Sequence, residues 1–362
     1  MFMLDSNQYL MKKTIVLKVK SRKPERDKIS FAAAFIKKGG LVAFPTETVY
    51  GLGADALNPK AVLALFKAKR RPLDNPPIVH VCRVEDVYRL ADYVPPAAER
   101  IMRKFWPGPL TLIFKRSEIV PHVTVASLDT IGIRMPRHKV ALALLEESNC
   151  PLSAPSANLA GKPSPTSAKH VLIDLDGTID AVLDAGPTQI GVESTVMDLT
   201  VDPPQILRPG GTAYEVLKKV VDSVRLSASA TAEKPISVKK ARSPGVKYRH
   251  YAPDAEMFVV DGELSAVVDK IKELTHVHIR CGRKVRILCT DETVHNYRKD
   301  IAKSMGKRSD LSTVARNLFN VLREVDLEGV DVIIAEGVQL DGLGLAIMNR
   351  LRKASGYEIV KV

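Results

Sequence analysis

Strand-like and helix-like segments alternate along two parts of this chain, and a stretch with neither pattern separates the two. In the first part, about residues 27–211, a helical pattern at 29–36 leads into an apolar strand at 41–44, and a second helix and strand follow at 61–69 and 78–82. Further strands are expected at residues 110–115, 130–135, 181–183 and 195–199. Such alternation is typical of a layered α/β domain. Because turns rather than helices separate the later strands, the sheet of this domain should be mixed.

The alternation stops at about residues 227–253, which are rich in Ser, Ala, Lys and Pro and are expected to form a linker. Strands return at 257–260, 285–288 and 332–335, and helical patterns at 264–274 and 311–325 lie between them. These patterns predict a second, smaller α/β domain with a parallel sheet. We therefore divide the chain into an N-terminal extension at 1–23, a first domain at 24–216, a linker at 217–253 and a second domain at 254–362.

The composition indicates a globular chain with an excess of positive charge. Its 54 Lys and Arg residues outnumber 41 Asp and Glu residues, which gives a formal net charge of +13. Such an excess attracts polyanions, for example nucleotides or RNA. No apolar run reaches the roughly 20 residues of a membrane-spanning helix, and the opening residues lack the order of a secretory signal. We therefore expect a cytoplasmic protein with no membrane partner.

The cysteines and histidines show no metal-binding pattern in the sequence. The four cysteines are scattered without a CxxC pair, so neither a disulfide framework nor a zinc site is predicted. His276 and His278 alternate within "THVHIR", and we expect them to share one face of an edge strand. Because no third ligand lies near them in the sequence, we predict no metal site built by the protein itself.

The stretch "FPTETVYGLGADA" directly follows the predicted strand at 41–44. Polar residues at the carboxyl end of a strand are where open α/β sheets usually bind ligands, so a binding site is plausible here. The alternative is a plain turn, in which Gly51 and Gly53 serve only to reverse the chain.

The basic stretch "FKAKRRPLDNPPIVHV" follows at the end of a predicted helix. Lys69 and Arg71 precede Pro72, which favours extended backbone, so both cations could converge on one anion. A planar guanidinium and a compact ammonium together suit a polyphosphate. Alternatively, these cations only interact with the dipole of the helix end. Asn75 and His80 add neutral polar groups nearby.

Two further stretches carry polar residues in unusual surroundings. "TIGIRMPRH" places Arg134 in an apolar strand, where its charge requires either an anionic ligand or an ion pair with an acid, and the sequence leaves both open.

In "PLSAPSANLAGKPSPTS", Ser156 and Asn158 share a face of extended chain, and small neighbours would let a ligand approach the backbone. A Ser/Pro-rich surface loop is the competing interpretation, and Ser164 could belong to either.

Two more candidates lie near the ends of predicted strands, Ser194 in "GVESTVMDLT" and Arg208 in "ILRPGG". The candidates supply hydroxyls, cations and at least one acid, but the sequence has neither a Ser-His-Asp order with elbow glycines nor the GxxxxGK[ST] pattern of a P-loop. We therefore expect a site that binds and orients charged small molecules and catalyses by electrostatics.

These motifs, in this order and together with "FWPGPLT", resemble the YrdC-like domain of threonylcarbamoyl-AMP synthases. "SPGVKYRHYAP" in the linker and "GLGLAIMNRLRKA" near the end resemble the two-domain members of that family. The resemblance implies an α/β fold in which a YrdC-like catalytic domain with a twisted mixed sheet and a basic cavity occupies 24–216. It further implies a linker at 217–253 that acts as a lid and a smaller Rossmann-like parallel α/β domain at 254–362.

The resemblance also implies an activity. ATP, L-threonine and bicarbonate or CO2 would give L-threonylcarbamoyladenylate and pyrophosphate, with Mg²⁺ accompanying ATP, so the enzyme would be a nucleotidyltransferase. A downstream threonylcarbamoyl transferase complex would then modify the tRNA adenosine beside the anticodon, which makes tRNA an indirect partner. The alternative is a non-catalytic RNA-binding protein with a basic concave surface, although the sequence lacks an arginine-rich tract with interleaved aromatic residues.

The resemblance assigns roles to residues by their positions in the motifs. Threonine would be held by Thr48, His80, Arg134, Ala154 and Ser194, and Arg134 would take its carboxylate. ATP would be surrounded by Lys69, Arg71, Asn75, Thr130, Ser156, Asn158, Ser164 and Arg208, and Tyr248 or Tyr251 of the linker would close over it. Lys69 and Arg71 would be catalytic. Glu47 suits the ammonium group of threonine better than a phosphate, because an acid repels polyanions.

Overall fold

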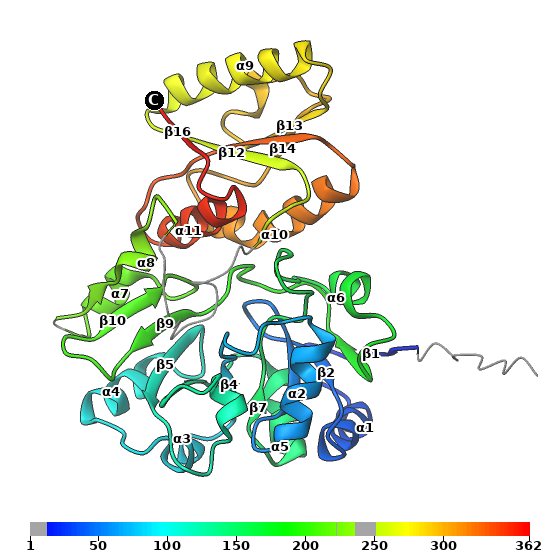
Figure 1. The fold of residues 1–362 in the computed structure, drawn as a ribbon, viewed down its shortest axis with the longest axis vertical. Coiled ribbons are helices and arrows are strands. Elements are labelled where there is room, and N and C mark those ends of the chain that lie inside the picture. The colour runs from blue at the N-terminus through cyan, green and yellow to red at the C-terminus, as the bar shows by residue number, and fades with distance from the viewer. Residues whose placement is uncertain (1–12, 222, 236–250) are drawn as a thin grey trace, which may run out of the picture.

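The computed structural model describes residues 13–221, 223–235 and 251–362, which form two lobes (Figure 1). The first lobe contains a mixed sheet and the second a parallel sheet, as the sequence predicts. No helix in these ranges is both long enough and apolar enough to cross a bilayer. The location of the protein in the cell stays a prediction.

The sheet of the first domain has eleven strands within the described residues. Their spatial order is β1 (Ile15–Lys18), β8 (Ala181–Asp184), β2 (Val42–Pro45), β3 (Tyr50–Asp55), β7 (Leu152–Ser153), β4 (Val79–His80), β6 (Thr130–Arg134), β5 (Leu110–Lys115), β9 (Thr195–Asp198), β10 (Gln205–Arg208) and β11 (Arg225–Leu226). β2 pairs antiparallel with β3 and parallel with β8, so the sheet is mixed. β1 lies within the expected N-terminal extension and β11 within the expected linker, yet both belong to this sheet.

Helices cover both faces of this sheet because successive side chains of a strand point to opposite faces. Val42 and Phe44 of β2 pack with the helices α1 (Arg26–Lys37) and α5 (Lys139–Ser148). Ala43 packs on the other face with α2 (Pro59–Ala68) and α6 (Ala168–Leu175). The other helices are α3 (Glu85–Leu90), α4 (Pro96–Phe105), α7 (Tyr214–Lys218) and α8 (Ala228–Thr231). The 3-10 turn η1 (His122–Val125) lies in the first domain and η2 (Val294–Asn296) in the second.

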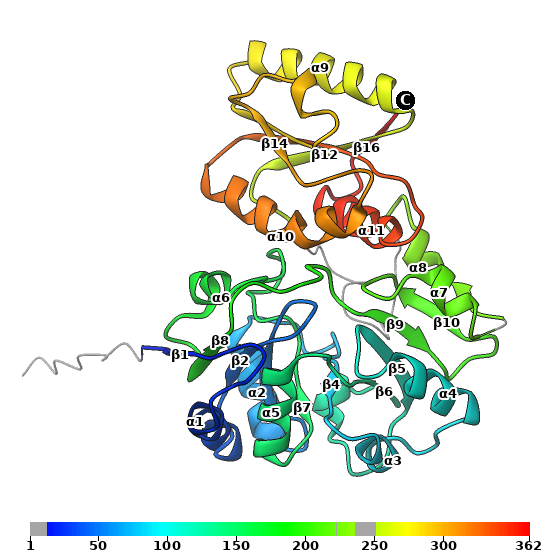
Figure 2. The same ribbon diagram turned by 180° about the vertical axis from the view of Figure 1, so that it is seen from behind.

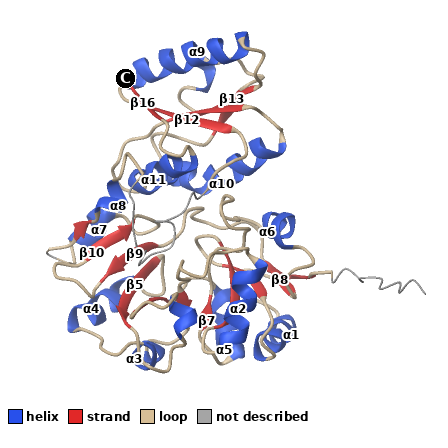
Figure 3. Cartoon of the chain, in the orientation of Figure 1, coloured by secondary structure: helices blue, strands red, loops and turns tan. Residues whose placement is uncertain are grey.

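The second domain has three layers (Figures 1 and 3). Its parallel strands lie in the order β14 (Ala302–Ser304), β13 (Val285–Cys289), β15 (Val332–Glu336), β12 (Glu256–Asp261) and β16 (Ile359–Lys361). The helix α9 (Leu264–Arg280) covers the face away from the first domain. The helices α10 (Leu311–Leu327) and α11 (Gly344–Ala354) cover the other face and lie next to the first domain.

The expected edge strand with His276 and His278 is wrong, because both residues belong to α9. Val268, Ile271 and Thr275 are buried at helical spacing, and the helix continues through the "THVHIR" segment. β-branched residues in a short window suggest a strand, but the longer apolar repeat decides the structure.

Residues of both domains belong to one buried apolar cluster. Figure 2 shows from behind that α10 and α11 lie next to the first domain. Val49 and Val192 of the first domain lie in the same buried cluster as Phe319 of α10. Gly191 has a φ of +83°, and a Cβ there would come within 2.3 Å of the Ala315 carbonyl oxygen in α10. The second domain therefore packs directly on the loop that precedes β9.

Candidate active site

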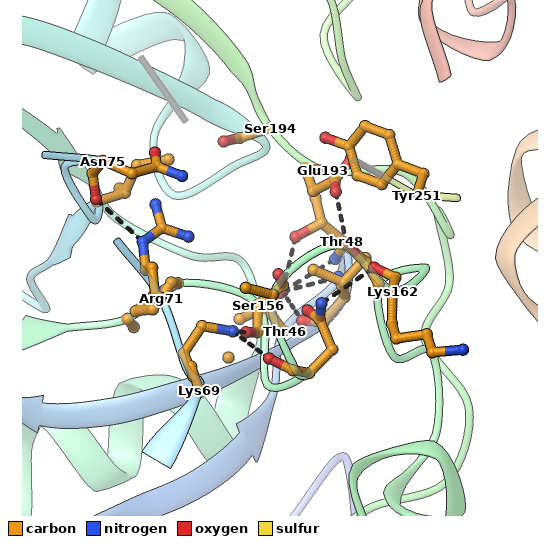
Figure 4. Close-up of a pocket in the computed structure, with 18 of the residues that line it drawn as sticks. Thr46, Thr48, Lys69, Arg71, Asn75, Ser156, Lys162, Glu193, Ser194 and Tyr251 are labelled. Carbon is orange, nitrogen blue, oxygen red and sulfur yellow. Dashed lines mark hydrogen bonds between the residues drawn. The ribbon is translucent and has the colours of Figure 1, made fainter. Parts of the chain in front are cut away.

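A cavity of about 330 Å³ lies in the first domain and reaches the linker residue Tyr251. Most of the residues predicted from the sequence line it, namely Thr48, Lys69, Arg71, Asn75, His80, Arg134, Ala154, Ser156, Asn158, Ser164, Ser194, Arg208 and Tyr251. Figure 4 shows Lys69 and Arg71 on one side of this space and Glu193 beside Tyr251 on another. Residues more than a hundred positions apart in the sequence thus meet at one site.

Two predicted ATP contacts do not line this cavity. Thr130 begins β6 and lines a separate, smaller cavity together with Thr111 and Gly132. Tyr248 lies outside the described residues, as does the rest of the "SPGVKYRHYAP" motif before Tyr251.

The loop after β2 is ordered by its own side chains. Thr46 accepts hydrogen bonds at Oγ1 from the backbone N–H groups of Thr48 and Val49, and its hydroxyl donates to the Val49 carbonyl oxygen at 2.7 Å. The glycines of this motif do not form the plain turn considered above, because Gly51 and Gly53 lie within β3. A Cβ on Gly53 would come within 2.9 Å of the Phe44 ring, so this position requires a small residue.

Lys69 and Arg71 enter the cavity where α2 ends. Asn58 caps the start of this helix by accepting hydrogen bonds from two backbone N–H groups, and Lys69 is its C-terminal cap residue. The Lys69 ammonium donates to the backbone carbonyl oxygens of Ser156 and Asn158, which belong to another loop. The side chain of Lys69 therefore extends across the cavity and does not interact with the end of its own helix.

The cavity cations donate to neutral backbone oxygens. Arg71 donates from Nε to the Asn75 carbonyl oxygen at 3.0 Å and from Nη2 to that of Pro76 at 3.1 Å. Arg208 donates from Nη2 to the Ser194 carbonyl oxygen at 3.0 Å. Burial, with a contribution from Arg208, lowers the pKa of Arg71 to about 10. Burial, with a contribution from the charge of Arg71, also lowers the pKa of Lys69 well below its ordinary value.

Arg134 differs from these cations because an acid pairs with it. Its Nη2 lies 2.8 Å from Glu47 Oε1, and its Nη1 donates to Thr48 Oγ1 at 3.0 Å. Both charged side chains are buried, and Glu47 is not part of the cavity lining. The expectation that Glu47 faces a ligand ammonium is therefore wrong. Of the two interpretations left open for Arg134, the ion pair is observed, and the arginine also reaches the cavity.

His80 is held neutral at this site. Burial first, and then the charge of Arg134, lower the pKa of His80 to about 3. Ser194 lies nearby in the lining, where its hydroxyl is 2.8 Å from that of Thr111. This side of the cavity therefore offers a compensated arginine and neutral polar groups.

Known proteins resemble both parts of the chain. Residues 34–210 match the family described as "Telomere recombination", and residues 212–356 match the one described as "Threonylcarbamoyl-AMP synthase, C-terminal domain". The threonylcarbamoyl-AMP synthase of Pyrococcus abyssi is 51% identical, and the alignment covers 96% of this chain and 100% of that protein. The one from Bacillus subtilis is 47% identical and covers 92% of this chain and 94% of that protein. The chain belongs to the threonylcarbamoyl-AMP synthase family.

Solved structures agree with this assignment. The crystal structure of P. abyssi Sua5 complexed with L-threonine matches with a TM-score of 0.92 at 50% identity, over 96% of this chain and 100% of that one. E. coli YciO matches with a TM-score of 0.51 at 26% identity, over 54% of this chain and 96% of that one. The predicted two-domain type and fold class are thus confirmed. Threonylcarbamoyl-AMP synthases are enzymes, so the alternative of a non-catalytic RNA-binding protein is not supported.

Sequence reasoning missed the acid of this synthase cavity. Glu193 is the one carboxylate among the described lining residues. Its Oε1 accepts a hydrogen bond from Ser164 at 2.6 Å, and its Oε2 accepts one from Nε of Arg350 in α11 at 2.7 Å. Burial raises the pKa of Glu193, but Arg350 and Arg208 outweigh it and the net pKa is about 2. The available signal was an acid directly before Ser194 in the "GVESTV" motif.

Lys162 was also missed. It lines the cavity and forms ion pairs with Asp254 at 2.7 Å and Asp326 at 3.2 Å. Asp326 belongs to α10, so this lysine connects the cavity edge with the second domain.

Proposed function

We propose that this synthase forms L-threonylcarbamoyladenylate and pyrophosphate from ATP, L-threonine and bicarbonate or CO2. The observation that carries the proposal is a group of cations, the buried Lys69 and Arg208 and the half-buried Arg71, which face one cavity and donate mainly to backbone oxygens. Such cations suit a triphosphate, whose charges would compensate them. The similarity to a Sua5 protein that was crystallised with L-threonine supports the amino-acid substrate.

Threonine would bind beside Arg134. The Glu47–Arg134 pair has no net charge, and His80 is neutral, so this region suits an amino acid whose own charges cancel. Arg134 would take the carboxylate, while Thr48, Ala154 and Ser194 would complete the binding site. ATP would lie against Lys69, Arg71, Asn75, Ser156, Asn158, Ser164, Arg208 and Tyr251. Roles for Thr130 and Tyr248 remain predictions from the family resemblance.

The reaction requires two anions to meet. The neutral amine of threonine attacks CO2 and loses a proton to solvent, or attacks bicarbonate with loss of water. An oxygen of the resulting carbamate then attacks the α-phosphorus. The bond from that phosphorus to the bridging oxygen breaks, and pyrophosphate leaves. Lys69, Arg71 and Arg208 would offset the repulsion and stabilise the charge that develops on the phosphate oxygens.

The cavity fits Mg²⁺ that arrives with ATP. No group of three or more potential metal ligands lies within the part of the chain that the structure describes. Glu193 is the only described carboxylate of the lining, and Arg350 pairs with it. Mg²⁺ in nucleotide sites commonly uses phosphate oxygens, water and only one or two carboxylates. When bound, it would neutralise phosphate charge, and Glu193 is the side chain that could approach it.

Pyrophosphate release tests this function. ATP is supplied with both L-threonine and bicarbonate, and each of the two is then omitted in turn, in buffer purged of CO2. We expect release only when both are present. Release that needs neither substrate would contradict the proposal. We further propose that the adenylate passes in the cytoplasm to a transferase complex that modifies tRNA, which the same assay tests when that complex and tRNA are added.

A further inference from the structure

One buried arginine of the second domain contacts the cavity wall at two places. Arg350 of α11 is fully buried, and its Nε donates to Glu193 Oε2 at 2.7 Å. Its guanidinium carbon lies 5.3 Å from the ring centre of Tyr251, within the range of a cation–π contact. Glu193 and Tyr251 both line the cavity, where Figure 4 shows them side by side. One side chain of the second domain thus contacts two parts of the wall.

Tyr251 depends on the second domain for its position. Its backbone has a φ of 64°, which is costly for a residue with a Cβ and persists only where the surroundings enforce it. The ring stacks on Phe319 of α10, with centroids 5.2 Å apart, and it also lies against the guanidinium of Arg350. These two contacts come from the second domain, so that domain helps to fix this part of the wall.

Arg350 also determines which cation Glu193 pairs with. Glu193 lies close enough to Arg208 for the two charges to influence each other, but its ion pair is with Arg350, at 2.7 Å. If Arg350 lost its charge, Glu193 would remain buried and would turn to Arg208, the other arginine whose charge lowers its pKa. That pairing would remove a cation that the proposed function assigns to the phosphates.

We propose that Arg350 is a positioning residue of the active site, which holds Glu193 away from Arg208 and fixes Tyr251 in the cavity wall. This inference rests on the proposed function, because it assigns Arg208 to ATP. Its role is distinct from that of Arg352 on the same helix. Arg352 is also buried, but it pairs with Glu233 at 2.9 Å and forms no ion pair or hydrogen bond with a described residue of the cavity lining.

Steady-state pyrophosphate release in three variants tests the proposal. We expect Arg350→Gln to lower kcat/KM for ATP by about 10- to 100-fold, as loss of a supporting partner commonly does. Arg350→Lys should retain more activity because it keeps the charge. Arg352→Gln is the matched control and should stay within about 3-fold of the parent protein, since its partners Glu233 and Asp261 do not line the cavity.

A second substitution separates positioning from folding. In Arg350→Gln/Glu193→Gln the carboxylate can no longer compete for Arg208, so kcat/KM for ATP should recover relative to Arg350→Gln alone. Thermal unfolding of each variant measures stability independently. Equal losses in Arg350→Gln and Arg352→Gln, or no recovery in the double variant, would overturn the proposal. If the parent protein made no pyrophosphate, the proposed function would fail instead. Calorimetric titration with a non-hydrolysable ATP analogue would still test the positioning role, because affinity should fall in Arg350→Gln, stay near the parent value in Arg352→Gln and recover in the double variant.

Discussion

Two sides of one cavity treat buried positive charge in opposite ways. Arg134 is compensated by Glu47 at 2.8 Å, whereas Lys69 and Arg71 donate to backbone carbonyl oxygens and form no ion pair within the described residues. Because Glu47 neutralises Arg134, this side of the cavity has no net attraction for anions, but the arginine can still donate directional hydrogen bonds. Such a site suits a substrate without net charge. Charge left without an acid suits a triphosphate. The comparison teaches that charge balance within each side, more than the total charge of the protein, determines which substrate fits.

The largest expected effect comes from the side whose cations lack acids. Lys69→Ala or Arg71→Ala should lower kcat for pyrophosphate formation by about 10²- to 10³-fold, which is typical when one preorganised stabiliser of developing charge is lost. Lys67→Ala is a suitable control, because Lys67 is exposed on the same helix. Near-parental turnover in both cavity variants would remove the basis for the charge argument.

Substitutions in the Arg134–Glu47 pair should mainly lower the free energy of unfolding. Arg134→Gln leaves Glu47 buried without its partner and should destabilise the fold by about 3 kcal/mol, measured by denaturant unfolding. Arg134→Gln/Glu47→Gln removes both charges and should recover much of this loss. If the double variant were no more stable than the single one, the pair would not be the reason that Arg134 tolerates burial.

At neutral pH the smallest effect concerns His80, because it appears only as the pH falls. The pKa of His80 is about 3 in the folded protein, below its ordinary value of 6.5. Between those values the unfolded chain binds the proton and the folded protein does not, so this group makes stability fall as the pH falls from 6.5 towards 3. His80→Asn should therefore lose less stability than the parent protein between pH 6.5 and pH 3, as measured by thermal melting at each pH. Parallel curves would indicate that His80 is protonated in the folded state.

The sequence predicted those site residues that follow local patterns. Lys69 and Arg71 come directly after an amphipathic helix that is capped by Asn58, and Ser156 lies in a run of small residues after a short strand. Chain direction and strand position are enough to place such residues at one edge of a sheet. The alternation of elements likewise predicted both sheets.

Residues that depend on distant partners could not be predicted in this way. Whether Glu47 faces the ligand or Arg134 depends on a strand 87 positions away, and Glu193 acquires its role from Arg350 in the other domain. β1 also escaped prediction, because its pairing with β8 joins segments from opposite ends of the first domain. Local patterns do not encode such contacts, since only the assembled fold brings these residues together.

Calorimetric titration of Arg71→Gln with two ligands tests the central claim most directly. The claim is that one side of the cavity reserves its charge for ATP while the other binds an amino acid without net charge. We predict that the Kd for a non-hydrolysable ATP analogue rises by about 10-fold or more, as expected when a charged hydrogen bond is lost, while the Kd for L-threonine stays within about 2-fold. Equal weakening of both ligands would contradict the account.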